Sequence, residues 1–190
     1  MNKATLGYAM TGSFCTFEKS LAQLQALVKE GYAALPILSF HAAQTDTRFG
    51  KAQDFIARME DLTGHTVLQT LTAVEPIGPK KLCDLLIVSP CTGNTLGKLA
   101  AGIYDTPVTL AVKSQLRAGR PVLLGVSTND ALEGSAASIG TLLARRGIFF
   151  IPLSQDAPTH KARSCVCDFS KTQAAVEAAL QNEQLQPMIF

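Results

Sequence analysis

The sequence Thr11-Gly-Ser-Phe-Cys-Thr-Phe17 follows an apolar run from Ala4 to Met10 and precedes a segment whose apolar residues have helical spacing. This order is typical of a strand, a tight turn and the first turn of a helix. Gly12 permits the turn, and Ser13 and Thr16 can cap the helix. Free backbone N–H groups at such a helix start favour an anion, most often a phosphate. An ordinary strand-to-helix connection without a ligand has the same local pattern.

The composition fits one globular domain, which we expect to span residues 1–190, because 47% of the residues are hydrophobic. The formal net charge is only +2, and the Lys and Arg residues are scattered apart from pairs such as Lys80-Lys81 and Arg145-Arg146. Scattered charge favours neither nucleic acid nor anionic lipid as a partner. A small, phosphorylated ligand is the better candidate.

The start of the sequence lacks a signal-peptide pattern, and no apolar run reaches the roughly 20 residues that a membrane span needs. We therefore expect a cytoplasmic protein without membrane contact. The five cysteines are an odd number, which predicts free thiols. The spacing of Cys165-Val-Cys167 is too tight for a zinc site, and we expect no metal.

Apolar runs that read as strands alternate with helical patterns along the whole chain. Their starts are Ala4, Ala33, Thr66, Asp84, Arg120 and Gly147. Runs that are apolar throughout are typical of a parallel sheet covered on both faces. We predict an α/β, Rossmann-like fold with a doubly wound parallel sheet of six strands in the order 3-2-1-4-5-6 and helices on both faces. Between the strands we expect a polar loop over Phe40 to Thr47, a helix over Arg48 to Leu62 and an irregular loop over Ser154 to Cys167.

In this strand order, the first and fourth strands lie side by side where the winding reverses. Their C-terminal loops, Thr11 to Phe17 and Pro90 to Thr95, then border one crevice. Ser39 and the segment Ser127 to Asn129 end the neighbouring strands. Four polar strand-end loops converge on one place, which favours a ligand-binding role for the opening turn.

The crevice does not have the pattern of a dinucleotide site, which usually shows G-x-G-x-x-G after the first strand and an acidic residue after the second. Gly12 stands alone before Phe14, and Ser39 occupies the acidic position. No Gly-Lys-Ser or Gly-Lys-Thr follows a strand. A mononucleotide phosphate held by hydroxyls and backbone N–H groups fits better.

Three motifs together resemble the flavoprotein family of FMN-containing cysteine decarboxylases and flavin prenyltransferases. They are Thr11-Gly-Ser13, Ser89-Pro-Cys-Thr-Gly-Asn-Thr95 and the loop that contains Asn129. In that family the middle motif reads roughly Pro-Ala-Thr-Ala-Asn-Thr. The stretch Gly7 to Phe17 is more similar to one branch of the family, whose members form one subunit of a two-subunit oxidoreductase of sporulating bacteria.

The resemblance implies an FMN-type pocket, with the phosphate near the opening turn and the flavin near the later loops. The residues that it places around FMN are Gly12, Ser13, Phe14, Ser39, Pro90, Thr92, Asn94, Thr95, Ser127, Thr128 and Asn129. It also implies a homo-oligomer built on trimers, a small dicarboxylate substrate, and a partner subunit that carries NADP.

The sequence departs from the decarboxylases where they place a catalytic His, eight positions before the Asp that opens strand four. Counting back from Asp84 reaches Pro76, which cannot transfer a proton, and Thr128 replaces the Met of the family's Pro-x-Met-Asn signature. Cysteine-type decarboxylation is therefore not expected. The remaining candidates for a catalytic role are Cys91, Asn129, Cys165 and His41. Three functions stay open: a dicarboxylate-forming oxidoreductase subunit, a decarboxylase or prenyltransferase with a relocated proton donor, and a non-catalytic binding subunit.

Three sets of side chains have two interpretations each. Lys161 and Arg163 can clamp substrate carboxylates if their loop folds over the pocket, or they can belong to a solvated basic loop. Cys15 and Cys91 lie near expected helix starts, which would lower a thiol pKa, or they serve as small core residues. Lys98, one turn into the next helix, can reach an acidic ligand or face solvent.

Overall fold

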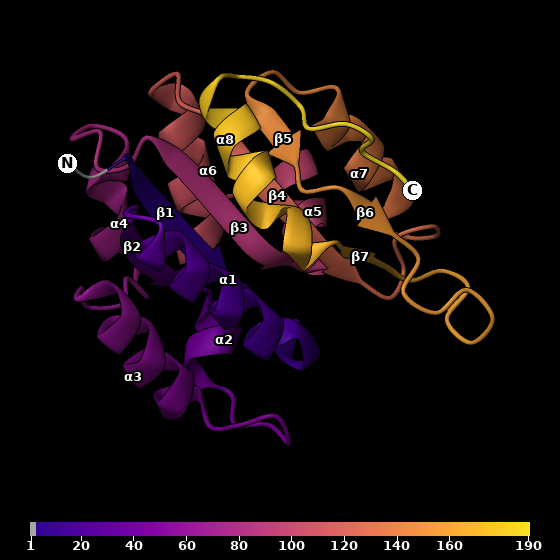
Figure 1. Ribbon diagram of the computed structural model, residues 1–190, viewed down its shortest axis with the longest axis horizontal. Helices are drawn as coiled ribbons and strands as arrows, with labels where there is room; N and C mark the ends of the chain where they lie inside the picture. Colours follow the sequence, from indigo (N-terminus) through magenta and orange to yellow (C-terminus); the bar gives the residue numbers. More distant parts are fainter. Residues whose placement is uncertain (1–2) are drawn as a thin grey trace.

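A twisted sheet runs through the centre of the molecule between two layers of helices in the computed structural model, which describes residues 3–190 (Figure 1). The strands are β1 (Thr5–Met10), β2 (Ala33–Leu38), β3 (Leu85–Cys91), β4 (Val122–Thr128), β5 (Ile148–Phe150), β6 (Leu153–Ser154) and β7 (Cys165–Cys167). The order is β2-β1-β3-β4, with β5 parallel to the first part of β4. The strand β7 pairs antiparallel with the end of β4, and β6 pairs with β7.

The predicted doubly wound topology is confirmed, but the sheet has seven strands and the prediction of six was wrong. The third predicted strand is reduced to one parallel bridge, in which the N–H of Leu68 donates to the carbonyl of Pro36 at 2.9 Å. It ends there because the side chain of Thr70 accepts the N–H of Ala73 and caps a short helix. The extra strand β7 lies in the segment expected to be irregular, Ser154 to Cys167, and β6 lies where that segment begins.

The helices are α1 (Phe17–Lys29), α2 (Phe40–Gln44), α3 (Ala52–Thr63), α4 (Leu71–Val74), α5 (Gly93–Ala100), α6 (Pro107–Arg117), α7 (Ala136–Leu143) and α8 (Thr172–Leu180), with single 3-10 turns η1 (Phe14–Thr16), η2 (Glu75–Ile77) and η3 (Phe169–Lys171). None of the helices formed by residues 3–190 is long and apolar enough to span a membrane.

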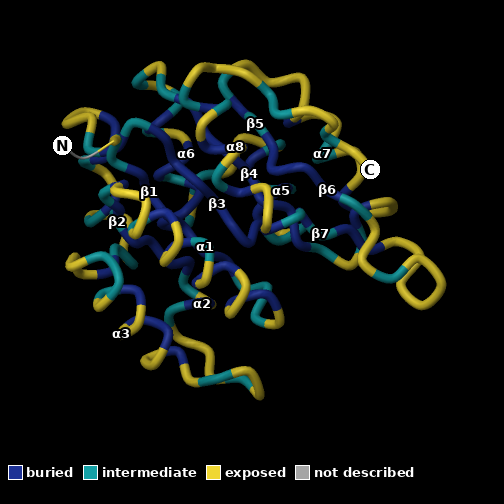
Figure 2. The backbone as a smooth tube through the Cα atoms, in the orientation of Figure 1, coloured by how far each residue is buried: buried dark blue, intermediate teal, exposed yellow. Residues whose placement is uncertain are grey.

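The strands are buried, and their side chains contribute to two apolar cores, one on each face of the sheet (Figure 2). On β1, Leu6 and Tyr8 pack with α1, α3 and α8, whereas Ala9 packs with the side chains of α4, α5, α6 and α7. Successive residues of β3 alternate between the cores in the same way, as expected for side chains that point to opposite faces of a strand. Both faces are therefore covered, and the strand ends remain as the places for a ligand.

The segment before α3 differs from the prediction in a way that affects the site. The expected helix over Arg48 to Leu62 starts only at Ala52, and Phe40–Gln44 forms α2 where a loop was expected. Between them, Thr47 and Gly50 form an antiparallel bridge, and Gly50 has a φ of 145°. Such a φ favours glycine, so Gly50 ends the turn before the helix can begin.

Candidate ligand-binding pocket

A pocket of about 780 Å³ lies at the C-terminal ends of β1, β3 and β4. It is the place where ligands bind in doubly wound folds. The residues expected around the crevice that line it are Gly12, Ser13, Phe14, Thr92, Asn94, Ser127, Thr128, Asn129 and Lys161. Further lining residues, which were not predicted as ligand contacts, are Cys15, Thr16, Lys19, Arg48, Phe49, Gly93, Asp130, Asp156, Ser164 and Val166.

A larger hollow of about 910 Å³ lies at the opposite edge of the sheet, where β4 and β5 begin. Two of its arginines are already bonded within the fold. Arg120 donates to Asp84 and to the Cys83 carbonyl, and Arg145 donates to Tyr104. We therefore place the candidate site at the other edge, where the polar loops meet.

Thr11 joins the turn after β1 to the end of β3. Its hydroxyl donates to the carbonyl of Pro90 at 2.9 Å and accepts the N–H of Thr92 at 3.0 Å. The residue is 1% exposed, so these bonds are protected from water. They hold the two loops side by side, as the strand order predicts.

The turn after β1 also reaches β4. The hydroxyl of Ser13 lies 2.8 Å from that of Ser127, and the hydroxyl of Thr16 donates to the Ser13 carbonyl at 2.8 Å. Ser13 and Thr16 do occupy cap positions, but neither side chain accepts a backbone N–H. As a result, the N–H groups of Phe14 and Cys15 have no acceptor among residues 3–190. These hydroxyls and N–H groups form a cradle of hydrogen-bond donors, which is the chemistry that an anion requires.

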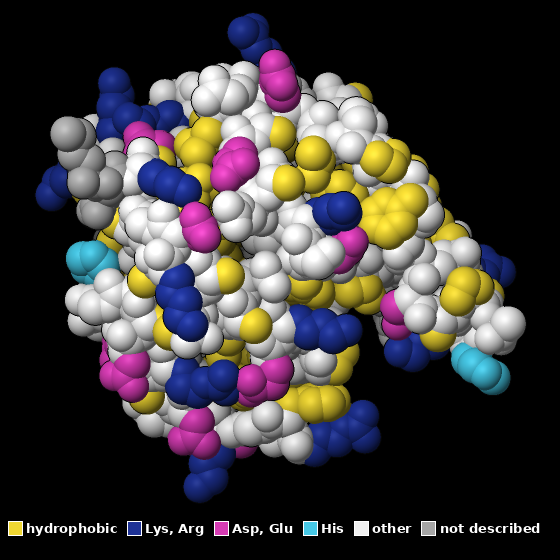
Figure 3. Space-filling model, viewed as in Figure 1, with side chains coloured by type: hydrophobic (Ala, Val, Ile, Leu, Met, Phe, Trp, Pro, Cys, Tyr) yellow, Lys and Arg dark blue, Asp and Glu magenta, His cyan; other side chains and the backbone are white. Residues whose placement is uncertain are grey.

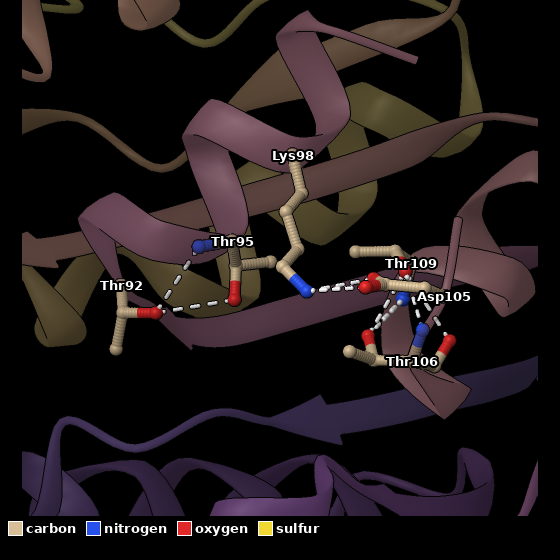
Figure 4. Close-up of polar contacts among 6 residues, drawn as sticks. All are labelled: Thr92, Thr95, Lys98, Asp105, Thr106 and Thr109. Atoms are coloured by element: carbon tan, nitrogen blue, oxygen red, sulfur yellow. Dashed lines mark hydrogen bonds and ion pairs between the residues drawn. The ribbon is translucent and has the colours of Figure 1, made fainter. Parts of the chain in front are cut away.

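Thr92 starts the helix on the other side of the pocket. Its hydroxyl accepts the N–H of Thr95 at 3.3 Å and lies 3.1 Å from the Thr95 hydroxyl, as Figure 4 shows. Farther along α5, the ammonium of Lys98 is 2.7 Å from both carboxylate oxygens of Asp105, beside the Thr106 cap of α6. Lys98 therefore links α5 to the start of α6 and does not line the pocket.

Asp130 places a carboxylate in the pocket wall. The hydroxyls of Thr128 and Ser135 donate to its Oδ1 atom at 2.5 and 2.8 Å. These two bonds lower the pKa of Asp130 below its usual value, so the side chain is an anion at neutral pH. Gly93 lies against the same group, because a Cβ atom there would be 2.5 Å from Ser135 Oγ and 2.7 Å from Thr128 Oγ1. Only glycine lets α5 begin this close to the Asp130 loop.

Three residues expected to contact a cofactor do not line the pocket. The hydroxyl of Ser39 accepts the N–H of Ala42 and caps α2. Pro90 is buried and uses its carbonyl to bind Thr11, while Thr95 is buried behind Thr92. These residues shape the loops, and their side chains are outside the lining of the pocket.

Among the four candidates for a catalytic role, only Asn129 lines the pocket. Cys91 and Cys165 are buried, and burial raises the pKa of both thiols. His41 is exposed on α2 and lies outside the lining. Cys15, by contrast, is exposed and lines the pocket.

The positive charges of the pocket differ in their pairing. Lys161 forms an ion pair with Asp156 at 3.1 Å, and Arg163, which is not in the lining, pairs with Glu133 at 3.4 Å. The six ion pairs formed by residues 3–190 include neither Lys19 nor Arg48. Figure 3 shows the hollow between the turn before α3 and the protruding segment between β6 and β7, with Lys and Arg side chains on both sides.

No group of three or more His, Cys, Asp or Glu side chains in residues 3–190 is arranged to hold a metal ion. The pocket contains a cradle of hydroxyls and N–H groups, an exposed thiol and a carboxylate held by two hydroxyls. It also has two positive charges, Lys19 and Arg48, that form no ion pair within the described part of the chain.

Comparison with known proteins identifies the family of the chain. Residues 1–172 match the model of the family called Flavoprotein. The chain is 40% identical over 184 residues to the B subunit of dipicolinate synthase from Bacillus subtilis, a match that covers 97% of this chain and 92% of that protein. The crystal structure of the corresponding B subunit from Bacillus halodurans has a TM-score of 0.91 and 36% identity, covering 100% of this chain and 98% of the other. A dodecameric FMN-dependent UbiX-like decarboxylase from Escherichia coli O157:H7 has a TM-score of 0.64 and 25% identity, over 78% of this chain and 79% of the other. The chain belongs to the flavoprotein family.

Proposed function

We propose that this chain acts as the B subunit of a dipicolinate synthase. It would help to convert a dihydro- or hydroxytetrahydro-dipicolinate precursor to dipicolinate, together with an A subunit that carries NADP, in the mother-cell cytoplasm of a sporulating bacterium. The observation that carries the proposal is the 40% identity to the B subunit of a dipicolinate synthase over 97% of the chain. The pocket is consistent with it, because its two unpaired cations suit a dicarboxylate.

The cradle of hydroxyls and N–H groups is our proposed site for the phosphate of FMN. A flavin bound there would supply an acceptor for the two electrons that a dihydropyridine loses when it becomes aromatic. Ser13 and Ser127 would donate to phosphate oxygens, and Thr92 would orient the loop beside the ribityl chain. Asn129, directly after β4, would face the ring or the substrate. An absorbance spectrum of the purified protein with and without added FMN tests this part, and an unchanged flavin spectrum at saturating protein would contradict it.

The main test combines the purified chain with its A subunit and measures NADP-linked dipicolinate formation. Formation that requires both proteins supports the proposal, and the same rate from the A subunit alone contradicts it. If the chain is colourless and only tightens substrate binding by the A subunit, its role is regulatory in place of catalytic.

No feature of the pocket favours decarboxylation. Pro76 lies in η2 and does not line the pocket, and the two substitute proton donors Cys165 and His41 do not line it either. We therefore expect no carbon dioxide release from a cysteinyl peptide or from pantothenoyl-cysteine. Release from either compound would support the decarboxylase alternative.

We also propose that the chain forms a homo-oligomer built on trimers. The FMN-dependent relative is described as dodecameric, and Ile103, Leu132 and Leu143 expose 47%, 51% and 40% of their surface. A subunit contact would bury these side chains, which are otherwise in contact with water. Light scattering of the purified protein measures the mass, and a monomer at micromolar concentration would contradict the proposal.

A further inference from the structure

The turn Thr47–Gly50 holds two side chains at the mouth of the pocket. The N–H of Thr47 donates to the Gly50 carbonyl at 3.0 Å, and the N–H of Gly50 donates back at 3.1 Å. The N–H of Phe49 donates to the Thr47 hydroxyl at 3.1 Å. The carboxylate of Asp46, directly before the turn, accepts the N–H of Ala52, which follows the turn, at 2.9 Å. The tip, Arg48 and Phe49, is thus fixed by four hydrogen bonds although it projects from the surface.

The turn is also packed from below. A Cβ atom at Gly50 would lie 2.8 Å from the ring of Phe55, so the backbone of the turn rests directly on that ring. Phe55 in turn packs edge to face on Phe17 at 4.9 Å between ring centroids. The turn is therefore packed, through Phe55, against Phe17, the first residue of α1, which directly follows the cradle.

The two side chains at the tip, Arg48 and Phe49, are available to a ligand. Phe49 is 43% exposed and lines the pocket. The guanidinium of Arg48 lies over the Phe49 ring, 4.9 Å from its centroid, and forms no ion pair with residues 3–190. Lys19 lines the same pocket and likewise forms no ion pair with residues 3–190. A flat ring with a preorganised guanidinium beside it is suited to a planar, conjugated carboxylate.

The distribution of charge indicates where such a carboxylate would lie. Asp130 is an anion at the end of β4 and repels a carboxylate from that wall. Lys161 is already bound to Asp156. Lys19 and Arg48, which form no ion pair among the residues that the structure describes, are left to attract it. The fork of Arg48 matches a carboxylate with two parallel hydrogen bonds, whereas the hydroxyl cradle suits a phosphate.

We propose that Arg48 and Phe49 form the dicarboxylate-recognition element of the pocket: Arg48 binds one carboxylate that the precursor and its aromatic product share, Phe49 packs on the ring, and Lys19 adds the second positive charge. This inference rests on the proposed function and names the residues that select its substrate. It replaces Arg163, which pairs with Glu133, as the substrate-binding arginine.

Calorimetric titration with pyridine-2,6-dicarboxylate and with pyridine-2-carboxylate tests the proposal on the intact protein. The dicarboxylate should bind more tightly than the monocarboxylate. Arg48→Gln should weaken binding of the dicarboxylate by about tenfold or more, because it removes charge-assisted hydrogen bonds. Arg48→Lys should recover part of the loss, and Phe49→Ala should weaken binding of both compounds. Lys51→Gln is the matched control, because Lys51 is exposed after the same turn and does not line the pocket.

FMN titration separates the two ligands. Arg48→Gln should leave FMN binding within about twofold of wild type, whereas a loss of FMN binding equal to the loss of dicarboxylate binding would overturn the assignment. The assay with the A subunit separates this inference from the proposed function. If the wild-type pair makes dipicolinate and Arg48→Gln has the same KM, the recognition element is wrong and the function stands. If the wild-type pair makes none, the function itself is wrong.

Discussion

The hydroxyl of Ser13 lies 2.8 Å from the hydroxyl of Ser127, although their strands, β1 and β4, are separated by β3 in the sheet. The turn after β1 therefore crosses the end of β3 and contacts β4. This contact closes one side of the pocket, and both hydroxyl-bearing residues line it.

Removing this contact should weaken ligand binding more than it weakens the fold. Ser127→Ala deletes one hydroxyl, which costs about 1 kcal/mol of unfolding free energy for a single hydrogen bond. Because the same hydroxyl is expected to donate to the ligand, FMN affinity should fall by about fivefold to tenfold. Ser138→Ala is a control for the loss of a hydroxyl, since Ser138 makes no side-chain hydrogen bond among residues 3–190 and is outside the pocket. Equal affinities of Ser127→Ala and wild type would remove Ser127 from the site.

Gly93 and Gly97 give a matched pair on α5. A Cβ at Gly93 would be within 2.9 Å of three oxygen atoms, whereas at Gly97 the nearest heavy atom is Ser138 Oγ at 3.9 Å. Gly97→Ala should raise the unfolding free energy by up to about 1 kcal/mol, because alanine favours the helix. Gly93→Ala should lower it and displace the Asp130 loop. Denaturant unfolding measures both, and a stable Gly93→Ala variant with normal FMN binding would show that α5 does not need this close approach.

The thiols should differ sharply in reactivity. Cys15 is exposed in the pocket, whereas burial raises the pKa of Cys83 to about 11 and of Cys167 to about 12. Cys91 and Cys165 are buried as well. A thiol reagent should therefore modify one cysteine quickly in the native protein and all five after denaturation. The Cys15→Ser variant should lose the fast phase, and bound FMN or dicarboxylate should slow it. Fast labelling that persists in Cys15→Ser would contradict the burial of the other four.

Asp130 should contribute to the acid sensitivity of the protein. Its pKa in the folded state is lowered by the hydroxyls of Thr128 and Ser135, below the unfolded value of about 3.9. Its stabilising contribution is thus present above that pH and is lost as the pH falls through the folded-state value. Asp130→Asn should lower the unfolding free energy most at neutral pH, and the difference from wild type should shrink below about pH 4. Thr128→Val, which removes one donor, should have a smaller effect of the same sign. A constant difference from pH 7 to pH 2 would argue against this role.

The part of the site that depends on strand order could be predicted from the sequence. A parallel sheet with its winding reversed between β1 and β3 requires the loops after Met10 and Cys91 to meet, and the Thr11 hydroxyl joins them. Strand order does not predict which hydrogen-bond partner each hydroxyl has. Ser39 follows β2 as expected, but its oxygen accepts the N–H of Ala42 and caps α2, because a helix begins directly after it.

The turn before α3 and the strands β6 and β7 were not predicted, because each interrupts a local sequence pattern or is too short to form one. The apolar spacing of α3 was extended back to Arg48, yet Gly50 interrupts it and was the available signal for a turn. The pair β6 and β7 was missed because the segment between them is polar, although Cys165-Val-Cys167 alternates buried, half-buried and buried. A strand of three residues gives too short an alternation to separate from a loop.

The bonds that close the pocket join residues far apart along the chain: Thr11 and Thr92 are separated by 81 positions, and Ser13 and Ser127 by 114. We expect such contacts to form late in folding, because the entropy of closing long loops is lost before they can be made. A nascent chain that ends before β4 lacks Ser127 and cannot complete the cradle. A ligand that needs all three strand ends should therefore slow unfolding, with little effect on the rate of folding.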